Sequence, residues 1–423
     1  MISPMHLLLT IIVGASILLM LIRPRNIPEV YWIAGGVLLL LLLRLISPEL
    51  AARASLRAVD VCLFLVGMML LSELARDHGV FDWLSSVAVR GSNGSCSRLF
   101  ALVYAAGTLV TIFMSNDATA VVLTPAILAA VRRAKVRPLP HLFACALIAN
   151  AASFLLPISN PANLVVFHGR MPPLGRWLLA FGVPSLISIA TTFAVMRWLF
   201  RNALSDRIEF EIEAQPLKND GKLVLCGLAV TIVVLLTVSS LGMNLGLPTC
   251  LVALAVTAAL SIKTRTNPIA LARQISWETL ALVAGLFVMV DTIKSIGAMR
   301  HIQGWIAWAQ NLGTSAGVFV TGFAVGIANN LVNNLPLGLI AGSALQAAHA
   351  NSLIANAVLI GVDLGPNLSI TGSLATILWL IALRKEKLDV SFWSFLKVGV
   401  VAMPVALLAS LGGTILMHVF FPT

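Results

Sequence analysis

The sequence predicts an all-α polytopic membrane protein made of two inverted repeats, each with five spans and one re-entrant hairpin. Three observations predict this fold. Hydrophobic residues make up 59% of the 423 residues and charged residues only 11%, whereas a soluble domain has roughly 25% charged residues. Apolar runs of about 20 residues, long enough to cross a bilayer, recur along the chain. Four apolar segments are broken by short polar stretches, and broken helices are tolerated at the membrane midplane only around a protein-enclosed cavity.

The first repeat is predicted to cover residues 1–200. It has a hairpin at about 99–131, broken at Ser115-Asn116-Asp117, and a broken span at 140–168, interrupted around Ser159-Asn160. Because the first ten residues lack a basic region and no cleavage site follows, we expect a first span there and not a cleaved signal peptide. The unbroken spans are expected near 5–22, 29–46, 59–75 and 176–200.

A charged linker at 201–221 is followed by the second repeat, predicted at 222–423. Its hairpin at about 314–348 is broken by the polar run from Asn329 to Asn334, and its broken span at 352–383 is interrupted between Gly365 and Gly372. The alternative for each hairpin is two full spans joined by a polar turn; the polarity of the tips favours re-entry into a cavity. The unbroken spans are expected near 222–241, 247–262, 277–294 and 391–419.

The two halves match when the residue numbers of the first half are shifted by one constant amount. This shift, which pairs Gly67 with Gly285, is called the glycine offset. Five spans per half is an odd number, so the second half would be inverted relative to the first. Inverted repeats with broken helices are the architecture of many secondary transporters. The same offset also aligns Glu73 with Asp291, Arg76 with Lys294, Gly79 with Gly297, and Ser115-Asn116 with Asn333-Asn334.

The net charge of +11 is explained by Lys and Arg residues in the short loops between the spans. With ten spans and two re-entrant hairpins, most of the Lys and Arg fall on one face, including the cluster from Arg132 to Arg137. The positive-inside rule makes this face cytoplasmic and puts both termini outside. The aromatic residues form no stripe interleaved with basic residues, so the sequence gives no support for nucleic-acid binding.

The polar breaks carry the candidate substrate site. Their side chains are neutral hydrogen-bond donors and acceptors, suited to a small polar solute, and each break exposes free backbone groups at half-helix ends. Capping of the half-helices alone is the alternative role for any one of them. The predicted substrate-binding residues are Asn116, Thr119, Ser159, Asn160, Asn163, Asn330, Asn333, Asn334, Asn367, Thr371 and Ser373.

Two acids stand beside these breaks, Asp117 in the first hairpin and Asp363 before the second interruption. A carboxylate within the bilayer costs about 2.5–3.5 kcal/mol on insertion scales, so such residues are functional by default. We expect both to carry a proton or hold a cation. For Asp117, capping of the helix after the tip is the alternative. Glu73 and Asp291 each have a base three residues later and are interpreted as interfacial ion pairs.

Enzymatic and metal-binding signatures are absent from the sequence. It has no GxxxxGK[ST], HExxH or GxSxG motif, so we expect no ATPase activity of its own. The five cysteines have no metal-ligand spacing, and no cofactor or metal is predicted.

At these same residues the sequence resembles the arsenite/antimonite efflux permeases of the ion transporter superfamily. The strongest similarity is the DLGP segment from Asp363 to Pro366 followed by the GSLAT segment from Gly372 to Thr376. Further matches are Asn333-Asn334-Leu335-Pro336, Asn116-Asp117 and Ser159-Asn160. They occur in order in both halves, so the resemblance covers essentially the whole chain. Two departures are Pro161, where many members have an aliphatic residue, and Asn367, where many carry a lysine.

The resemblance implies a transporter of a prokaryotic plasma (inner) membrane that extrudes arsenite and antimonite in exchange for protons, some relatives working with a soluble ATPase. Trihydroxy-arsenic is a small neutral polyol that Asn, Ser and Thr can hydrogen-bond. One alternative is an anion carrier of the same superfamily. Related dicarboxylate carriers are expected to have Ser-Asn-Thr at the hairpin tips, and Asp117 in the third place should repel a dianion. The other alternative is the membrane subunit of an ATP-driven arsenite pump.

Overall fold

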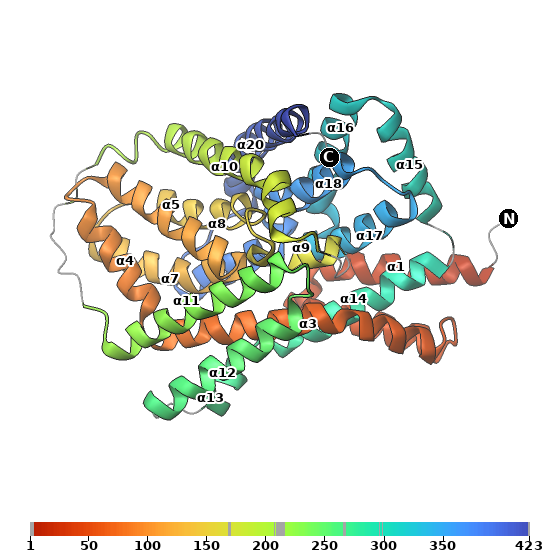
Figure 1. Ribbon diagram of the computed structural model, residues 1–423, viewed down its shortest axis with the longest axis horizontal. Helices are drawn as coiled ribbons and strands as arrows, with labels where there is room; N and C mark the ends of the chain where they lie inside the picture. Colours follow the sequence, from red (N-terminus) through yellow and green to blue (C-terminus); the bar gives the residue numbers. More distant parts are fainter. Residues whose placement is uncertain are drawn as a thin grey trace.

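The computed structural model describes residues 4–167, 171–206, 208, 216–264, 268–295, 297 and 299–421. Every element in these ranges is a helix (Figure 1), as the sequence predicts. Helix starts follow local capping chemistry. Before α3 (Pro48–Asp77), the Ser47 hydroxyl accepts a hydrogen bond from the Leu50 N–H at 3.1 Å, and Pro48 takes the first helical position, where its missing N–H has no cost.

The first half is a series of long helices interrupted at two places. The hairpin is formed by α5 (Cys96–Phe113), the short turns α6 (Asn116–Ala118) and η2 (Thr119–Leu123), and α7 (Thr124–Arg133). The broken span is formed by α8 (Leu139–Ala151), η3 (Pro157–Ser159) and α9 (Pro161–Val166). The other elements are α1 (Pro4–Ile22), η1 (Pro24–Asn26), α2 (Glu29–Leu42), α3, α4 (Val80–Gly91) and α10 (Leu174–Leu199).

The second half has the same order of elements. Its hairpin is formed by α16 (Thr314–Val332) and α17 (Asn334–Ala347), and its broken span by α18 (Ser352–Leu364), η4 (Gly365–Asn367), η5 (Ile370–Gly372) and α19 (Leu374–Lys385). The breaks therefore lie where the sequence predicts them. The other elements are α11 (Asn219–Ser240), α12 (Gly246–Thr264), α13 (Pro268–Gln274), α14 (Trp277–Ser295), α15 (Met299–Asn311) and α20 (Phe392–Phe420).

Helix pairing also repeats between the halves. Helix α3 packs on α12 as α14 packs on α2. The aligned glycines make both contacts possible: a Cβ on Gly67 would lie 2.8 Å from the Thr249 backbone, and one on Gly285 would lie 2.6 Å from the Ile33 side chain. The glycine offset thus matches positions with the same packing role. Inversion of the second half relative to a membrane stays a prediction.

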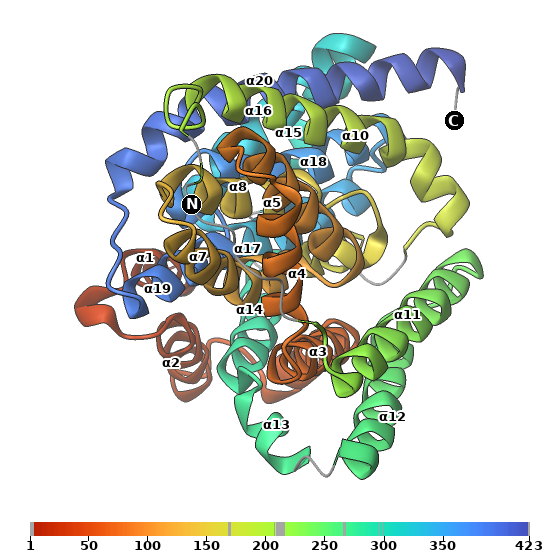
Figure 2. The same cartoon turned by 90° about the vertical axis from the view of Figure 1, so that its left-hand side faces the viewer.

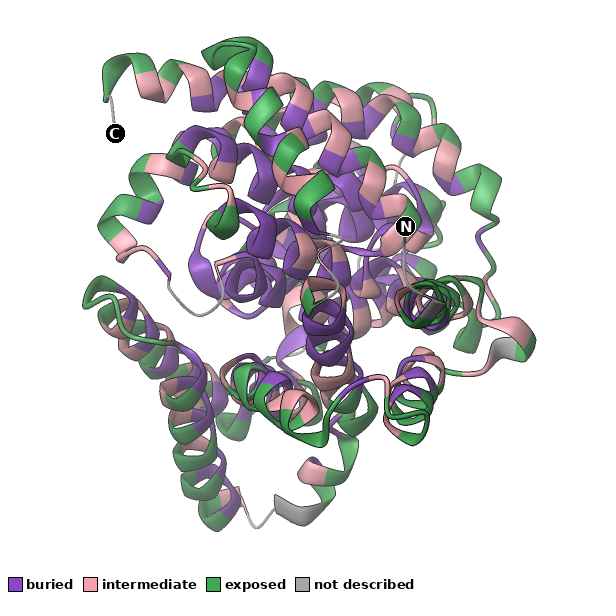
Figure 3. Cartoon of the chain, turned by 90° about the vertical axis from the view of Figure 1, so that its right-hand side faces the viewer, coloured by how far each residue is buried: buried purple, intermediate pink, exposed green. Residues whose placement is uncertain are grey.

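The helices form two layers. In Figure 2, α2, α3, α11, α12, α13 and α14 lie below, and α8 and α18, the first helices of the two broken spans, lie above them, under α10 and α20. Buried residues concentrate in the upper layer around α8 and α18, while the outer faces of the helices are exposed (Figure 3). Helix α8 is buried along its whole length from Pro140, so the broken spans form the core of the molecule.

Seven of the described helices are long and apolar enough to cross a membrane. They include α5 and α16, the first arms of the two hairpins, so helix length does not separate a re-entrant hairpin from a pair of spans. The count of ten spans and the domain bounds therefore stay predictions. Part of the predicted linker, residue 207 and residues 209–215, lies outside the described residues.

Candidate functional site

The first hairpin tip is built from the predicted Ser-Asn-Asp sequence. Ser115 caps α6, its hydroxyl accepting from the Ala118 N–H at 3.1 Å, and the Asn116 Oδ1 accepts from the Asp117 N–H at 2.9 Å. Ser159 of the broken span donates to the Ile112 carbonyl at 2.9 Å. The tip and the first break are therefore held together, although 47 residues separate the two ends of this bond.

Asp117 is the least constrained polar residue of this tip. Its side chain is partly exposed, whereas Asn116 and Ala118 on either side are buried. Within the described residues its carboxylate has neither a hydrogen bond nor an ion pair. Capping of the helix after the tip, the alternative role, is performed by Ser115. This leaves the Asp117 carboxylate available to a solute or a proton.

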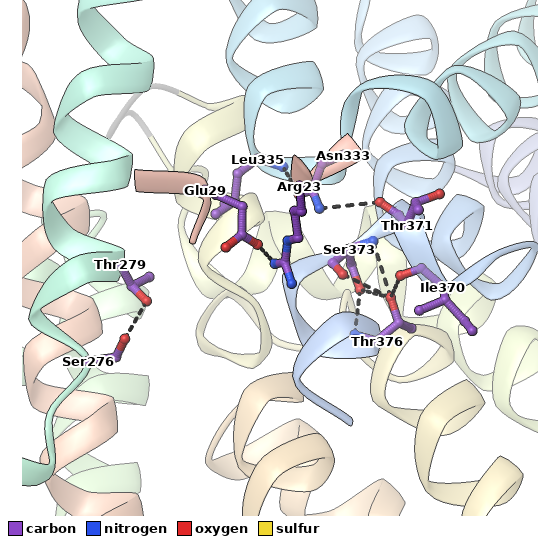
Figure 4. Close-up of polar contacts among 10 residues, drawn as sticks. All are labelled: Arg23, Glu29, Ser276, Thr279, Asn333, Leu335, Ile370, Thr371, Ser373 and Thr376. Atoms are coloured by element: carbon purple, nitrogen blue, oxygen red, sulfur yellow. Dashed lines mark hydrogen bonds and ion pairs between the residues drawn. The ribbon is translucent and has the colours of Figure 1, made fainter. Parts of the chain in front are cut away.

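The second hairpin tip is joined to the second break in the same way. Asn333 has a left-handed backbone (φ 76°), which turns the chain between α16 and α17, and its Nδ2 donates to the Thr371 carbonyl at 3.4 Å (Figure 4). The Thr371 hydroxyl donates to the Asn330 carbonyl at 3.0 Å, and Ser369 donates to the Asn330 Oδ1 at 2.7 Å. Asn334 is buried, and its Oδ1 has no partner in the described part of the chain.

The second half-helices, α9 and α19, begin with polar caps. The Asn160 Oδ1 accepts from the Ala162 N–H at 3.0 Å, and the Ser373 hydroxyl accepts from the Thr376 N–H at 3.1 Å within a capping box. The capping role that the sequence leaves open is thus present at both residues. Capping is not the only contact of Asn160 and Ser373, because each side chain also contacts the opposite broken span.

Asp363 lies where the two broken spans cross. It is completely buried, and its Oδ1 accepts from the Asn160 Nδ2 at 2.9 Å. Its Oδ2 has no hydrogen-bond partner among the described residues. Asn367 lies at the same crossing, accepting from the Asn150 Nδ2 at 3.0 Å and donating to the Leu147 carbonyl at 3.1 Å. The structure therefore brings Asn160, Asp363 and Asn367 together.

Two of the predicted substrate residues point into the protein instead. The Thr119 hydroxyl is buried against the Thr111 hydroxyl at 2.8 Å, within the first hairpin. The Asn163 Nδ2 donates to the carbonyls of Ser153, Leu156 and Pro157, at 3.0, 3.3 and 3.3 Å, and so closes the loop of the first break. The contacts of Thr119 and Asn163 therefore stabilise the first hairpin and the loop of the first break.

Sequence reasoning missed four residues of this region. Asn150 and Asn329 are fully buried, and Asn329 Nδ2 donates to the Gly361 and Val362 carbonyls at the end of α18. Their signal in the sequence was an amide side chain within an apolar run.

Arg23 and Glu29 form a half-buried ion pair (Figure 4). Burial lowers the pKa of Arg23 to about 10, so this residue stays charged at neutral pH. Glu29 lines a small cavity together with Asn333 and Thr371.

Two cavities occupy equivalent places in the two halves. One, of about 660 Å³, lies between the end of α3, the start of α4 and α7, with Gly79 in its lining. The other, of about 590 Å³, lies between the end of α14, the start of α15 and α17, with Gly297 in its lining. An adjoining cavity of about 410 Å³ shares Lys294 and Ser343 with the second. Asp291 in that cavity pairs with Arg57 and, at 3.6 Å, with Lys294.

Comparison with protein families gives a match over most of the chain. The family model described as the citrate transporter family CitMHS matches residues 1–362. The chain belongs to this family. Within the described residues, no three His, Cys, Asp or Glu side chains gather in a way that could hold a metal ion.

Relatives of this CitMHS-family chain agree with the resemblance noted in the sequence. An arsenical pump membrane protein of Yersinia enterocolitica is 25% identical over 349 residues, covering 79% of this chain and 81% of that protein. An arsenical pump membrane protein of Escherichia coli (strain K12) is 26% identical over 353 residues, with the same coverage of both chains. The predicted resemblance is confirmed, and the chain is a membrane transporter of the arsenical pump and CitMHS type.

A solved structure supports the fold. The crystal structure of the YdaH transporter of Alcanivorax borkumensis, described as having an unusual topology, matches with a TM-score of 0.59. The match covers 88% of this chain and 87% of that one, at 13% sequence identity. At this identity the likeness shows the fold alone, and it agrees with the predicted all-helical membrane fold.

Proposed function

We propose that this protein extrudes trivalent arsenic and antimony hydroxides in exchange for protons, by alternating access. The observation that carries the proposal is the region where the two hairpin tips meet the two broken spans. In this region neutral Asn, Ser and Thr side chains lie beside two carboxyl groups. The names of the relatives, arsenical pump membrane proteins, point to the same substrate class.

The residue types fit a small neutral polyol. Hydroxyl groups on arsenic or antimony can donate to amide oxygens and accept from amide and hydroxyl hydrogens. Buried acceptors without partners in the described residues, such as the Asn334 Oδ1 and the Asp363 Oδ2, are costly unless a bound solute, water or proton satisfies them. The orphaned oxygens therefore favour an occupied site.

The two carboxyl groups suit proton coupling in different ways. Asp117 at the first tip is partly exposed, so its carboxyl group is accessible for proton exchange, whereas Asp363 is completely buried between the broken spans. Acids held within a membrane protein commonly serve as proton relays. We assign the first contact with the exchanged proton to Asp117, and to Asp363 a change of protonation between the two broken spans.

Alternating access is supported by the equivalent cavities. With the orientation predicted from the basic residues, the cavity beside α4 and α7 opens to the cytoplasm and the one beside α15 and α17 to the outside. Helix α17 packs against α14. In transporters built from inverted repeats, one repeat moves against the other, so that contacts of this kind form on one side of the membrane while their counterparts open on the other.

The second candidate function is transport of an organic anion, favoured by the description of the matching family model as a citrate transporter. Half-helix N-termini can bind anions. Against this, Asp117 lies at the first tip, where a carboxylate repels a dianion.

The test is arsenite uptake into proteoliposomes under an imposed pH gradient without ATP. We expect uptake that follows the gradient and collapses on addition of a protonophore. Citrate and sulfate in excess should leave it unchanged.

Each failure has its own meaning. Citrate uptake with no response to arsenite would replace the proposal by the anion carrier. Uptake that requires an added soluble ATPase would make the protein the membrane subunit of an ATP-driven pump. Folded protein that transports neither solute would refute both transport proposals.

A further inference from the structure

The broken spans follow a different spacing from the rest of the repeat. Helix α8 begins at Leu139 and α18 at Ser352, and α9 begins at Pro161 and α19 at Leu374. Both pairs are related by one and the same offset, which is shorter than the glycine offset between α3 and α14. At this shorter offset Asn150 is the counterpart of Asp363, each being one residue before the end of its helix.

The two counterparts make crossed contacts. Asp363 near the end of α18 accepts from Asn160, the cap of α9, at 2.9 Å. Asn150 near the end of α8 accepts from Ser373, the cap of α19, at 3.5 Å. Each half-helix end thus holds the start of the half-helix from the other repeat. Aspartate and asparagine have nearly the same shape, so the junction is two-fold in form but carries only one carboxyl group.

The surroundings of the junction are neutral. Asn150, Asn160, Asp363 and Ser373 are all fully or almost fully buried. The elements packed on α18 are α8, α9, α16, α17, α20 and η4. Their titratable groups are His141 and Cys145 of α8 and Lys397 and His418 of α20, and none of these forms a hydrogen bond or ion pair with Asp363 in the described residues.

We propose that Asn150 and Asp363 form a single two-fold junction that joins the two broken spans, and that a carboxyl group at either position supports proton coupling. This inference rests on the proposed function, because it takes Asp363 as a coupling residue. Asn150 is a positioning residue: it acts through the Ser373 cap and through Asn367, which accepts its Nδ2 at 3.0 Å. Each position accepts a hydrogen bond from the cap of the opposite half-helix, at 2.9 Å for Asp363 and at 3.5 Å for Asn150. An aspartate at position 150 keeps this acceptor, and its second oxygen can donate to the Asn367 Oδ1, as the amide does now, when the carboxyl group is protonated.

The test relocates the carboxyl group. Asp363→Asn should lower pH-driven arsenite uptake at least about tenfold, roughly 1.4 kcal/mol in the barrier. The double variant N150D/D363N should return to within about threefold of the wild type. The matched control is C145D/D363N. It puts a carboxyl group on the same buried helix, at the position that the glycine offset pairs with Asp363. Its pH-driven arsenite uptake should stay as low as that of Asp363→Asn.

A second readout does not need arsenite. The thermal midpoint of purified protein is measured from pH 5 to 8. The difference between wild type and Asp363→Asn reports the junction carboxyl, and N150D/D363N should restore the wild-type dependence. Asn150→Asp alone should add a second pH-dependent component, and it decides the matter if the double variant does not fold.

The outcomes separate the two claims. Wild type without gradient-driven uptake would contradict the proposed function, and the midpoint measurement would then decide the junction by itself. Full coupling in Asp363→Asn would remove Asp363 from coupling and overturn the inference. Folded N150D/D363N that behaves like Asp363→Asn in both readouts would overturn the junction and leave the proposed function intact.

Discussion

Replacing Asp117 by asparagine should abolish arsenite uptake driven by a pH gradient while the protein stays folded. The side chain is partly exposed, and its carboxylate has no partner in the described residues, so an amide of the same shape removes only the charge and the exchangeable proton. We expect coupled uptake to fall by roughly 100-fold, about 2.7 kcal/mol in the barrier. The measurement is initial uptake into proteoliposomes, with the amount of inserted protein determined in parallel.

The matched control is Glu49→Gln, in the first turn of α3. Glu49 is an exposed acid paired with Arg53, and exposed pairs of this kind contribute about 0.3–0.5 kcal/mol. Uptake by that variant should equal the wild type. If Asp117→Asn transported arsenite at the full gradient-driven rate, Asp117 would have no role in coupling, and the carboxyl of Asp363 would have to act alone.

The broad organisation was predictable because it rests on local patterns. Apolar runs set the helices, and the polar interruptions at Ser115 and Asn333 mark real breaks in the chain. The glycine offset paired Gly67 with Gly285, and both glycines allow a close helix crossing. Glycine leaves a recognisable mark in a sequence because a close crossing accepts no larger side chain.

The partners of the polar residues could not be predicted. The bond between Asn160 and Asp363 joins residues 203 positions apart, and no local pattern fixes such a pairing. The change of spacing in the broken spans also hid Asn150, since the glycine offset pairs Asp363 with Cys145. Thr119 and Asn163 are polar residues of the same type as the others, yet they bond within their own hairpin and loop. Only the folded geometry separates these roles.

A methyl group added at Gly342 should both destabilise the protein and impair transport. Gly342 lies on α17, and a Cβ there would lie 2.2 Å from the Val166 carbonyl oxygen and 2.9 Å from its carbon. These are backbone atoms of α9, so no side chain can move aside and the hairpin must shift away from the broken span. Overpacking of this kind costs about 1–3 kcal/mol. The thermal midpoint of purified Gly342→Ala and its gradient-driven arsenite uptake measure the two effects.

Gly182→Ala is the control that isolates the cause. Gly182 is also inside a helix, α10, but a Cβ there would meet no atom within 4 Å. Alanine is favoured over glycine in a helix interior by about 1 kcal/mol, so this variant should be as stable as the wild type or more so, with unchanged uptake. Equal behaviour of the two variants would mean that α17 and α9 can separate freely, and that their close contact does not hold the second hairpin against the first broken span. A loss confined to Gly342→Ala ties transport to that contact, because the chemical change in the two variants is the same and only the neighbouring backbone differs.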